Sequence, residues 1–353
     1  MQASKAGNGS ARVEWIDFAK GVGILLVILA HTATIGRQGS AIRGLTFSFH
    51  MPLFFILSSL TFRYSRDMGE LVRKARRAAI HLLIPGVVVF ALFLFWPYFY
   101  NKPLWNSDDY WVRELYAFVF ASGVGQEFAG IDVPAMGVPW FFFALFFGRT
   151  LFDYLHLKYA KADLVFHCFL VSLVGVVLGR VQYLPMSLDV ALAIAPLFLA
   201  GCCLKDHAVW KRPVRLLLVS LTVWLLTLWL EFPNLDNWSY LELACRRYPM
   251  YPLCYLTAVA GTLFICALSI LAMKLGTLTA PIVYLGRNSL YMLVIHCLDG
   301  FWYRWWGAPG RQLLESAQRI VANLVVFIAF MLLKTAFDRA VGRARERKTS
   351  RAN

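Results

Sequence analysis

Long apolar segments restrict the fold of this 353-residue chain more than any other feature of its sequence. A helix that crosses roughly 30 Å of hydrocarbon needs about 20 predominantly apolar residues, and about ten runs approach or reach that length. They cover residues 16–35, 45–62, 78–98, 138–154, 164–179, 188–204, 214–230, 251–273, 281–303 and 319–337. Inside a bilayer each backbone polar group must be satisfied within the protein, which favours helices. The sequence therefore predicts an all-α, polytopic membrane bundle with about ten transmembrane helices.

The composition agrees with a membrane location. Hydrophobic residues make up 59% of the chain and the mean hydropathy is +0.59, whereas soluble domains are usually about 45–50% apolar. This excess excludes a water-soluble globular domain. We expect a cytoplasmic tail at 1–15, one membrane domain at 16–337 and a basic cytoplasmic tail at 338–353. Because the first apolar run carries Asp17, Lys20 and His31, we interpret it as a retained helix rather than a cleaved signal peptide.

The formal net charge of +15 would suggest a nucleic-acid partner in a soluble protein. Here the basic residues cluster in alternate loops, at 63–77, at 205–215 and at 334–351. Cytoplasmic loops of membrane proteins carry such an excess, so we predict that both termini are cytoplasmic and that no nucleic acid binds. The seven cysteines fall mostly in apolar runs and form no Cys-x-x-Cys pair, which predicts neither a metal site nor a disulfide framework.

One imidazole lies in the middle of the first apolar run. Titratable groups inside a bilayer are costly and are usually functional. His31 follows Lys20 by eleven residues, and eleven helical steps of about 100° return to within about 20° of the starting face, roughly 16 Å further along the axis. Lys20 at the membrane edge and His31 at depth therefore face the same surface.

Other polar residues extend this pattern. His50 and His296 lie in the second and ninth predicted spans, and all three imidazoles fall between mid-membrane and the outer half. Three basic residues lie instead at the inner edge or near mid-depth: Lys20, Arg149 and Arg287. Histidine titrates near neutral pH. The layout predicts a cavity with a cationic inner mouth for an anionic ligand and with deeper imidazoles for proton chemistry.

Each of these residues also has a purely structural explanation. A neighbouring carbonyl often satisfies an intramembrane histidine, and His50 could serve the carbonyl that Pro52 leaves without a donor. The charged residues could pair with one another, Lys20 with Asp17, Arg149 with Asp153 and Arg287 with Asp299. It is the combination of residues that favours a functional site.

Four blocks of sequence stand in a fixed order along the chain. They are Ile-Asp-Phe-Ala-Lys-Gly through His at 16–31, Phe-His-Met-Pro-Leu-Phe-Phe-Ile-Leu-Ser at 49–58, Pro-Trp-Phe-Phe at 139–142, and Gly-Arg-Asn-Ser-Leu-Tyr through His at 286–296. This ordered set resembles the acyltransferase-3 superfamily of membrane O-acyltransferases. The first block, in which ten residues separate a basic residue from a histidine, resembles its fucose 4-O-acetylase-like branch. Ser59 departs from the pattern, because the family usually has glycine there.

The resemblance implies transfer of acetyl from acetyl-CoA to a sugar hydroxyl of a cell-surface polysaccharide or lipid-linked oligosaccharide, in a bacterial inner membrane. It implies no tightly bound cofactor. The partners would be the acyl-CoA, a carbohydrate or glycolipid acceptor and the lipid bilayer. Which acyl group, which glycan, which membrane face and which oligomeric state apply are left open. A secondary transporter or flippase for a glycan or glycolipid is the alternative, since intramembrane His and Arg also line transport paths.

Roles for the polar residues follow from the resemblance. His31 would act as the general base that takes the proton of the attacking hydroxyl, a task to which histidine is well matched. A covalent acyl-histidine intermediate is the mechanistic alternative. The donor-binding set would receive the phosphates or the thioester end of CoA and comprises Lys20, Arg149 and Arg287. The set around the acceptor, or in support of the catalytic residue, comprises His50, Trp140, Ser289 and His296.

Overall fold

The computed structural model of the chain describes residues 13–32, 36–95, 109–205, 207–231, 240–303 and 312–352. It is 82% helical. The α-helices are α1 (Glu14–Thr32), α2 (Gly36–Phe47), α3 (His50–Thr61), α4 (Met68–Leu94), α6 (Tyr110–Phe120), α7 (Trp140–Lys158), α8 (Lys161–Val181), α9 (Leu188–Ala193), α10 (Ala195–Leu204), α11 (Pro213–Glu231), α12 (Leu253–Ala272), α13 (Ala280–Arg287), α14 (Ser289–Cys297), α15 (Gly300–Tyr303) and α16 (Gln312–Ala352). Short 3-10 helices are η2 (Pro185–Ser187), η3 (Ala208–Lys211), η4 (Leu243–Cys245) and η5 (Met273–Thr279).

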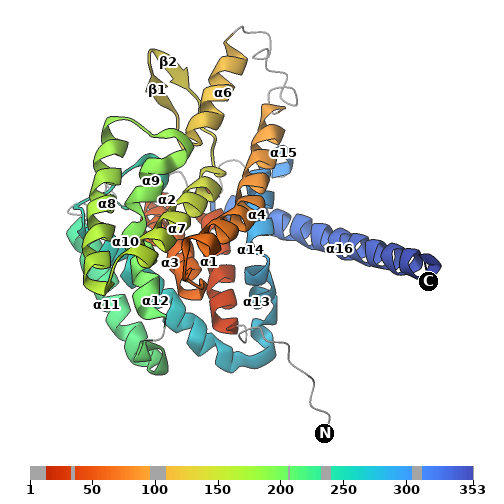
Figure 1. Cartoon of the computed structure of the whole chain (residues 1–353). Coiled ribbons are helices and arrows are strands. Elements are labelled where there is room, and N and C mark those ends of the chain that lie inside the picture. The colour runs from red at the N-terminus through yellow and green to blue at the C-terminus, as the bar shows by residue number, and fades with distance from the viewer. Residues whose placement is uncertain are drawn as a thin grey trace.

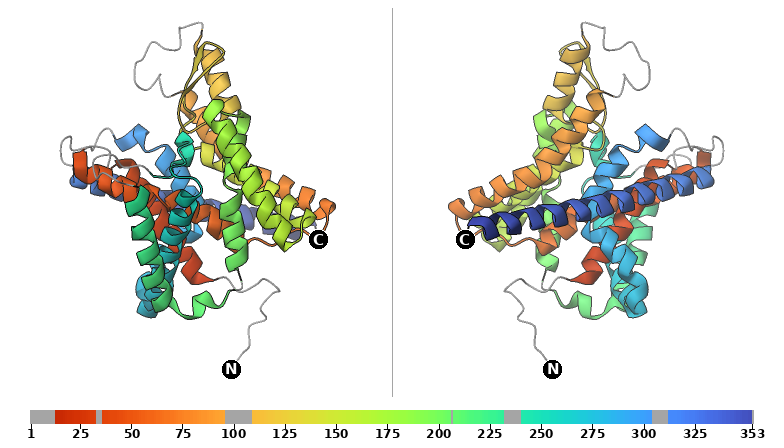
Figure 2. Two further views of the ribbon diagram at one scale, coloured as in Figure 1. Left: turned by 90° about the vertical axis from the view of Figure 1, so that its left-hand side faces the viewer. Right: turned by 90° about the vertical axis from the view of Figure 1, so that its right-hand side faces the viewer.

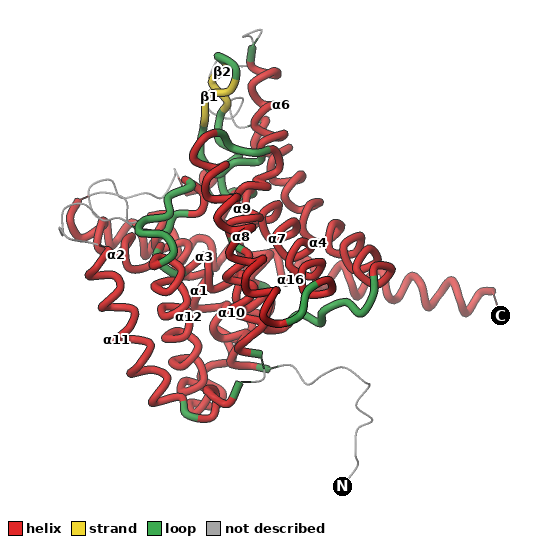
Figure 3. The backbone as a smooth tube through the Cα atoms, turned by 60° about the vertical axis from the view of Figure 1, so that its left-hand side comes forward, coloured by secondary structure: helices red, strands yellow, loops and turns green. Residues whose placement is uncertain are grey.

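The helices form one bundle with distinct ends. Helix α6 and the small sheet lie at one end, and the start of α1 lies toward the opposite end (Figure 1). The side views separate two groups of helices, one containing α4, α6, α7 and α8 and the other containing α11, α12 and α13 (Figure 2). Helix α16 leaves the bundle as a single long helix (Figure 3). The sheet is an antiparallel hairpin of β1 (Gln126–Phe128) and β2 (Ile131–Val133).

Six helical segments in the described part of the chain are long and apolar enough to cross a membrane. They are Ala41–Thr61, Met68–Leu94, Lys161–Val181, Pro213–Glu231, Leu253–Arg287 and Leu314–Gly342. A bent pair of helices, Pro185–Ala193 with Ala195–Leu204, raises this number to seven if it forms one span. The all-α polytopic bundle is thus confirmed, whereas the expected count of ten spans is not. The side of the membrane on which each terminus lies stays a prediction.

Breaks within predicted spans explain part of this difference. The run at 188–204 forms α9 and α10, which meet at an angle of 49°. Pro196 stands in the first turn of α10, where its ring and missing N–H prevent a continuous helix through this point. The run at 281–303 is divided at Asn288, between α13 and α14. Length and hydropathy reveal neither break.

Helix α1 is central to the part of the bundle that holds the conspicuous polar residues. It contacts α3, α12, α13, α14 and α16. Its crossing with α13 is very close, because a Cβ atom on Gly286 would lie 1.6 Å from the carbonyl oxygen of Asp17. A Cβ on Gly21 would lie 2.3 Å from the carbonyl oxygen of Ile282. Small residues at such crossings let helix backbones approach and pack tightly in membranes. This packing fixes the rotation of α1 relative to α13.

Candidate active site

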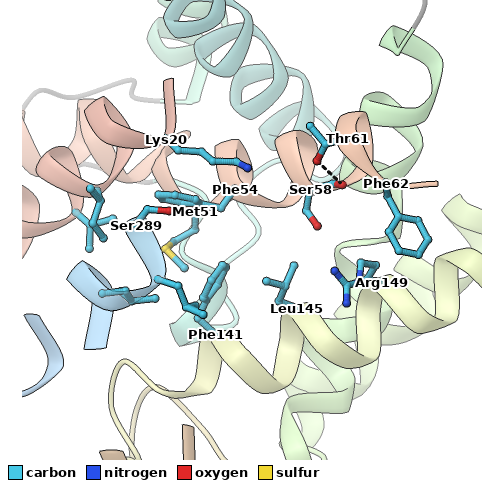
Figure 4. Close-up of a pocket in the computed structure, with 14 residues that line it drawn as sticks. Lys20, Met51, Phe54, Ser58, Thr61, Phe62, Phe141, Leu145, Arg149 and Ser289 are labelled. Carbon is cyan, nitrogen blue, oxygen red and sulfur yellow. Dashed lines mark hydrogen bonds between the residues drawn. The ribbon is translucent and has the colours of Figure 1, made fainter. Parts of the chain in front are cut away.

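A cavity of about 350 Å³ lies among α1, α3, α7 and α14. Its walls are mostly apolar, with polar groups supplied by Lys20, Ser58, Thr61, Arg149 and Ser289. Figure 4 shows Lys20 on α1 and Arg149 on α7 pointing into the same space, on either side of Ser58 from α3. The volume lies at the lower end of the range for small-molecule sites. The structure therefore brings together two of the three predicted donor-binding cations.

Basic side chains gather where α3 ends beside the cavity. The Arg149 guanidinium carbon lies 5.1 Å from the centre of the Phe62 ring, and Lys74 Nζ lies 5.4 Å from the same centre. Lys205 Nζ donates a 2.6 Å hydrogen bond to the carbonyl oxygen of Phe62. Three cations from separate parts of the chain thus meet at one ring and its backbone. Lys74 is paired with Glu70 over 2.9 Å, so it is the charges of Arg149 and Lys205 that favour an anionic group at that end of the cavity.

On α1 the face that lines the cavity continues to His31. Lys20, Ile24 and Val27 line the cavity, and His31 follows Val27 by one helical turn on the same face. His31 is partly buried and is not itself among the lining residues. The predicted shared face of Lys20 and His31 is therefore present, and the cavity ends one turn before the imidazole.

Helix α14 also lines the cavity and also carries a histidine just beyond it. Ser289 and Leu293 line the cavity, and His296 follows Leu293 by three residues. The ring centres of His31 and His296 are 5.4 Å apart. The structure thus pairs two of the three predicted imidazoles just beyond the cavity.

His50, the third imidazole, lies behind Phe47. The Phe47 ring centre is 4.5 Å from that of His50 and 5.6 Å from that of His31. His50 is fully buried, and its Nδ1–H donates a 2.9 Å hydrogen bond to the carbonyl oxygen of Thr46. The bond shows a histidine held by a neighbouring carbonyl, but that carbonyl belongs to Thr46 and not to Ser48, the residue whose carbonyl Pro52 leaves without a donor. The role of His50 toward an acceptor stays a prediction.

A cluster of polar side chains, Arg43, Tyr240 and Glu242, borders Phe47. Arg43 lies over the Phe47 ring at 4.5 Å and donates to the Tyr240 hydroxyl over 2.8 Å and to Glu242 over 3.0 Å. Burial, together with the Glu242 carboxylate, raises the pKa of Tyr240, so this side chain stays a neutral phenol at physiological pH. These residues connect α2 to the segment before η4 next to the imidazoles.

A buried hydrogen-bond network supports His296. Its Nδ1–H donates a 2.9 Å hydrogen bond to Asp299 Oδ2. Asp299 also accepts two 2.7 Å hydrogen bonds from Arg319, through Nε and Nη2, and one of 3.0 Å from Asn323 Nδ2. His296, Asp299 and Asn323 are each at most 3% exposed. Arg319 and Asn323 were not predicted from the sequence to have a role. Their spacing of four residues in an apolar run places both on one helix face, which is the signal that could have revealed them.

Arg287 lies away from the cavity. It donates to Asp17 over 3.3 Å and to Glu14 over 3.0 Å, and its side chain is exposed. The suggested pairing of Arg287 with Asp299 is therefore wrong, because Arg319 occupies that carboxylate. Donor binding by Arg287 stays a prediction.

Trp140 begins α7 and is buried. Its ring packs directly against Gly123. A Cβ atom on Gly123 would lie 2.7 Å from Trp140 Cδ1, so a residue with a side chain would clash there. The neighbouring Phe141 lines the cavity, but Trp140 does not. Trp140 thus holds the start of α7 in place, and its role toward the acceptor stays a prediction. Within the described ranges no group of three or more His, Cys, Asp or Glu side chains could hold a metal ion.

An all-α membrane bundle with a cationic cavity and paired imidazoles beyond it defines a polytopic membrane protein with an intramembrane site for reaction or transport. Residues 13–338 match the family described as an acyltransferase domain, the acyltransferase-3 family. The match covers nearly the whole chain, so the chain belongs to this family and is a membrane acyltransferase. The family match confirms that the four sequence blocks indicate the acyltransferase-3 superfamily. Membership of the fucose 4-O-acetylase-like branch stays a prediction. A comparison with curated proteins found no match.

Proposed function

We propose that this acyltransferase transfers acetyl from acetyl-CoA to a sugar hydroxyl of a cell-surface polysaccharide or lipid-linked oligosaccharide, in a bacterial inner membrane. The observation that carries the proposal is the single face of α1 that runs from Lys20 in the cavity to His31 one turn beyond it. The resemblance of the first sequence block to fucose 4-O-acetylase-like enzymes supports the choice of donor and acceptor.

The cavity suits the donor. The phosphates of CoA would lie near Arg149 at the cationic end, and the pantetheine arm would follow the apolar walls along α1 and α14. The rise from Lys20 to His31 is roughly 16 Å, a length that an extended arm spans. Arg287 is exposed beside Glu14 and would meet the nucleotide end of the donor outside the cavity.

His31 would act as the general base. The acceptor oxygen attacks the thioester carbonyl carbon while His31 takes the hydroxyl proton. This attack forms the new C–O bond and a tetrahedral intermediate. Collapse of the intermediate re-forms the carbonyl and breaks the C–S bond, and the departing CoA thiolate takes up the proton, so the products are the ester and CoA–SH. Val27 and Leu293 would have to separate slightly to let the thioester reach the imidazole from the cavity. His50, Trp140, Ser289 and His296 would surround the acceptor or support His31.

The test compares cells that carry the wild-type protein, His31→Ala or the control His167→Ala at equal protein levels in the membrane. His167 stacks on Tyr159 at 3.6 Å, on a part of α8 remote from the cavity, which makes it a matched histidine. Mass spectrometry of surface glycans should show O-acetyl groups in the wild type and the control, and none in His31→Ala. Normal acetylation with His31→Ala would remove the catalytic assignment.

A further inference from the structure

Two imidazoles next to the cavity have different surroundings. His31 has ring contacts with Phe47 and His296 and no hydrogen bond to a described residue. His296 is held by the Asp299 carboxylate, which is itself held by Arg319 and Asn323. Four hydrogen bonds converge on the Asp299 carboxylate, and bonds of this kind fix side-chain orientation strongly in a low-dielectric interior. The histidine with a fixed orientation is therefore His296.

The direction of the bond to Asp299 determines which nitrogen of His296 carries the proton. An ionised carboxylate only accepts hydrogen bonds, so Nδ1 must be the donor. The neutral ring then has its lone pair on Nε2. Arg319 and Asn323 are also donors toward Asp299, and within the described ranges Asp299 is the acceptor that His296 Nδ1 meets. Asp299 thus selects one tautomer of His296.

We propose that Asp299 is a positioning residue for acyl transfer, which holds His296 with Nε2 ready to accept a proton from His31. This inference rests on the proposed function. As the acceptor oxygen attacks, one ring nitrogen of His31 takes the hydroxyl proton, and the other gives its proton to His296 Nε2. Asp299 stabilises the imidazolium formed on His296. When the C–S bond breaks, the proton returns through His31 to the CoA thiolate, so the pair ends in its initial state.

The ring separation supports this path. With centres 5.4 Å apart, the two rings can exchange a proton directly after a small rotation or through one bridging water. Both rings lie on the faces of α1 and α14 that line the cavity one turn earlier. Asp299 lies behind His296 and does not line the cavity. Its loss should therefore affect the chemical step and leave donor binding unchanged.

The kinetic test uses the full-length protein in membranes and measures transfer of radiolabelled acetyl from acetyl-CoA into the polysaccharide and glycolipid of the same membranes. In Asp299→Asn, an NH2 group replaces one of the two oxygens that accept hydrogen bonds. This NH2 then faces a donor N–H, which disrupts the network. The expected result is a loss in kcat of about 100-fold or more, as for other orienting carboxylates, with an unchanged KM for acetyl-CoA. A kcat within twofold of wild type overturns the proposal.

Asp189 offers a matched control for the loss of a buried ion pair. It accepts two hydrogen bonds from Arg246, of 2.7 and 3.2 Å, and is as buried as Asp299. Asp189→Asn should lower thermal stability and leave kcat per folded molecule unchanged. If both Asn variants lose kcat equally, the effect of Asp299→Asn is general destabilisation and the positioning role is wrong.

A second measurement needs no enzymatic activity. In protein labelled with ¹⁵N-histidine, the nitrogen shifts of His296, assigned by comparison with His296→Gln, report its tautomer. The wild type should show the proton on Nδ1. A proton on Nε2 overturns the proposal, even where Asp299→Asn fails to fold. Absence of acetyl transfer by the wild type would instead contradict the proposed function, and the tautomer would still decide this inference.

Discussion

The three histidines near the cavity show how far a residue's surroundings decide what it can do. His50 is bound to a backbone carbonyl and His296 to a carboxylate, whereas His31 is surrounded by rings. A proton-transfer residue needs at least one nitrogen that can meet substrate. His31 also lies on the face of α1 that lines the cavity one turn earlier. These surroundings, rather than the residue type, favour His31 as the base.

Loss of a cavity cation should weaken donor binding. Lys20→Ala and Arg149→Ala each remove a charged donor to phosphate, and such a hydrogen bond contributes about 1.5–3 kcal/mol. We expect a rise of about tenfold or more in the KM for acetyl-CoA, with a smaller change in kcat, measured by radiolabelled transfer in membranes. Arg287→Ala should raise this KM by less, about fivefold at most, because an exposed ion-paired cation contributes about 0–1 kcal/mol. Equal effects of all three variants would contradict a binding site confined to the cavity.

His50 offers a separate test of a structural role. Asparagine can place its Nδ2–H near the position of His Nδ1 and donate to the same Thr46 carbonyl. We expect His50→Asn to keep most of the thermal stability. His50→Leu should lose about 1 kcal/mol, because the Thr46 carbonyl loses one hydrogen bond and keeps the one from the Phe49 N–H. If His50→Asn is stable but abolishes acetyl transfer, the imidazole itself acts on the substrate.

The sequence predicted some of these partners and not others. Lys20 and His31 lie on one helix, so their common face follows from helical periodicity alone. The pairing of Asp299 with Arg319 does not follow from periodicity. Asp299 follows α14 and Arg319 lies on α16, so only the packing of these two helices brings the guanidinium to the carboxylate. For Arg287 the sequence suggested Asp299 as a partner, whereas the close crossing of α1 and α13 brings it to Asp17.

At the scale of elements, the apolar runs predicted where helices form and missed where they break. The run at 281–303 is divided into α13, α14 and α15, with breaks at Asn288 and after Cys297. Hydropathy averages over such breaks, because a single polar residue in a long apolar window changes the mean little. The break at Asn288 places Ser289 at the start of α14, on the cavity wall.

The close packing of α1 against α13 should depend on Gly286, which has no side chain. In Gly286→Ala the new methyl group would overlap the carbonyl oxygen of Asp17, a backbone atom that cannot rotate away. We expect the helices to separate, with a loss of several kcal/mol of stability and a clear drop in Tm in detergent. Gly342→Ala on α16 is the control, since its Cβ would meet nothing within 4 Å and alanine favours a helix by up to about 1 kcal/mol. An unchanged Tm for Gly286→Ala would show that this crossing is looser than the structure indicates.

At the scale of the whole molecule, the arrangement of the ends relates topology to mechanism. The β1–β2 hairpin lies at the end of the bundle opposite the start of α1 (Figure 1). If the N-terminus is cytoplasmic, the hairpin faces the outside, and the cavity with its cations opens toward the cytosolic supply of acetyl-CoA. The excess of Lys and Arg at 334–351 favours a cytoplasmic C-terminus as well.

Reporter fusions in bacterial cells should establish this topology. We expect green fluorescent protein at the C-terminus to fluoresce and alkaline phosphatase at the same place to be inactive, because the first folds in the cytoplasm and the second needs the oxidising outer side. Phosphatase inserted at the turn between Phe128 and Ile131 should be active, since the turn joins two strands at the outer end. An active phosphatase at the C-terminus would place the basic tail outside and contradict the predicted cytoplasmic C-terminus. Activity at neither position would put the hairpin on the cytoplasmic side, and the cationic end of the cavity would then face away from the donor.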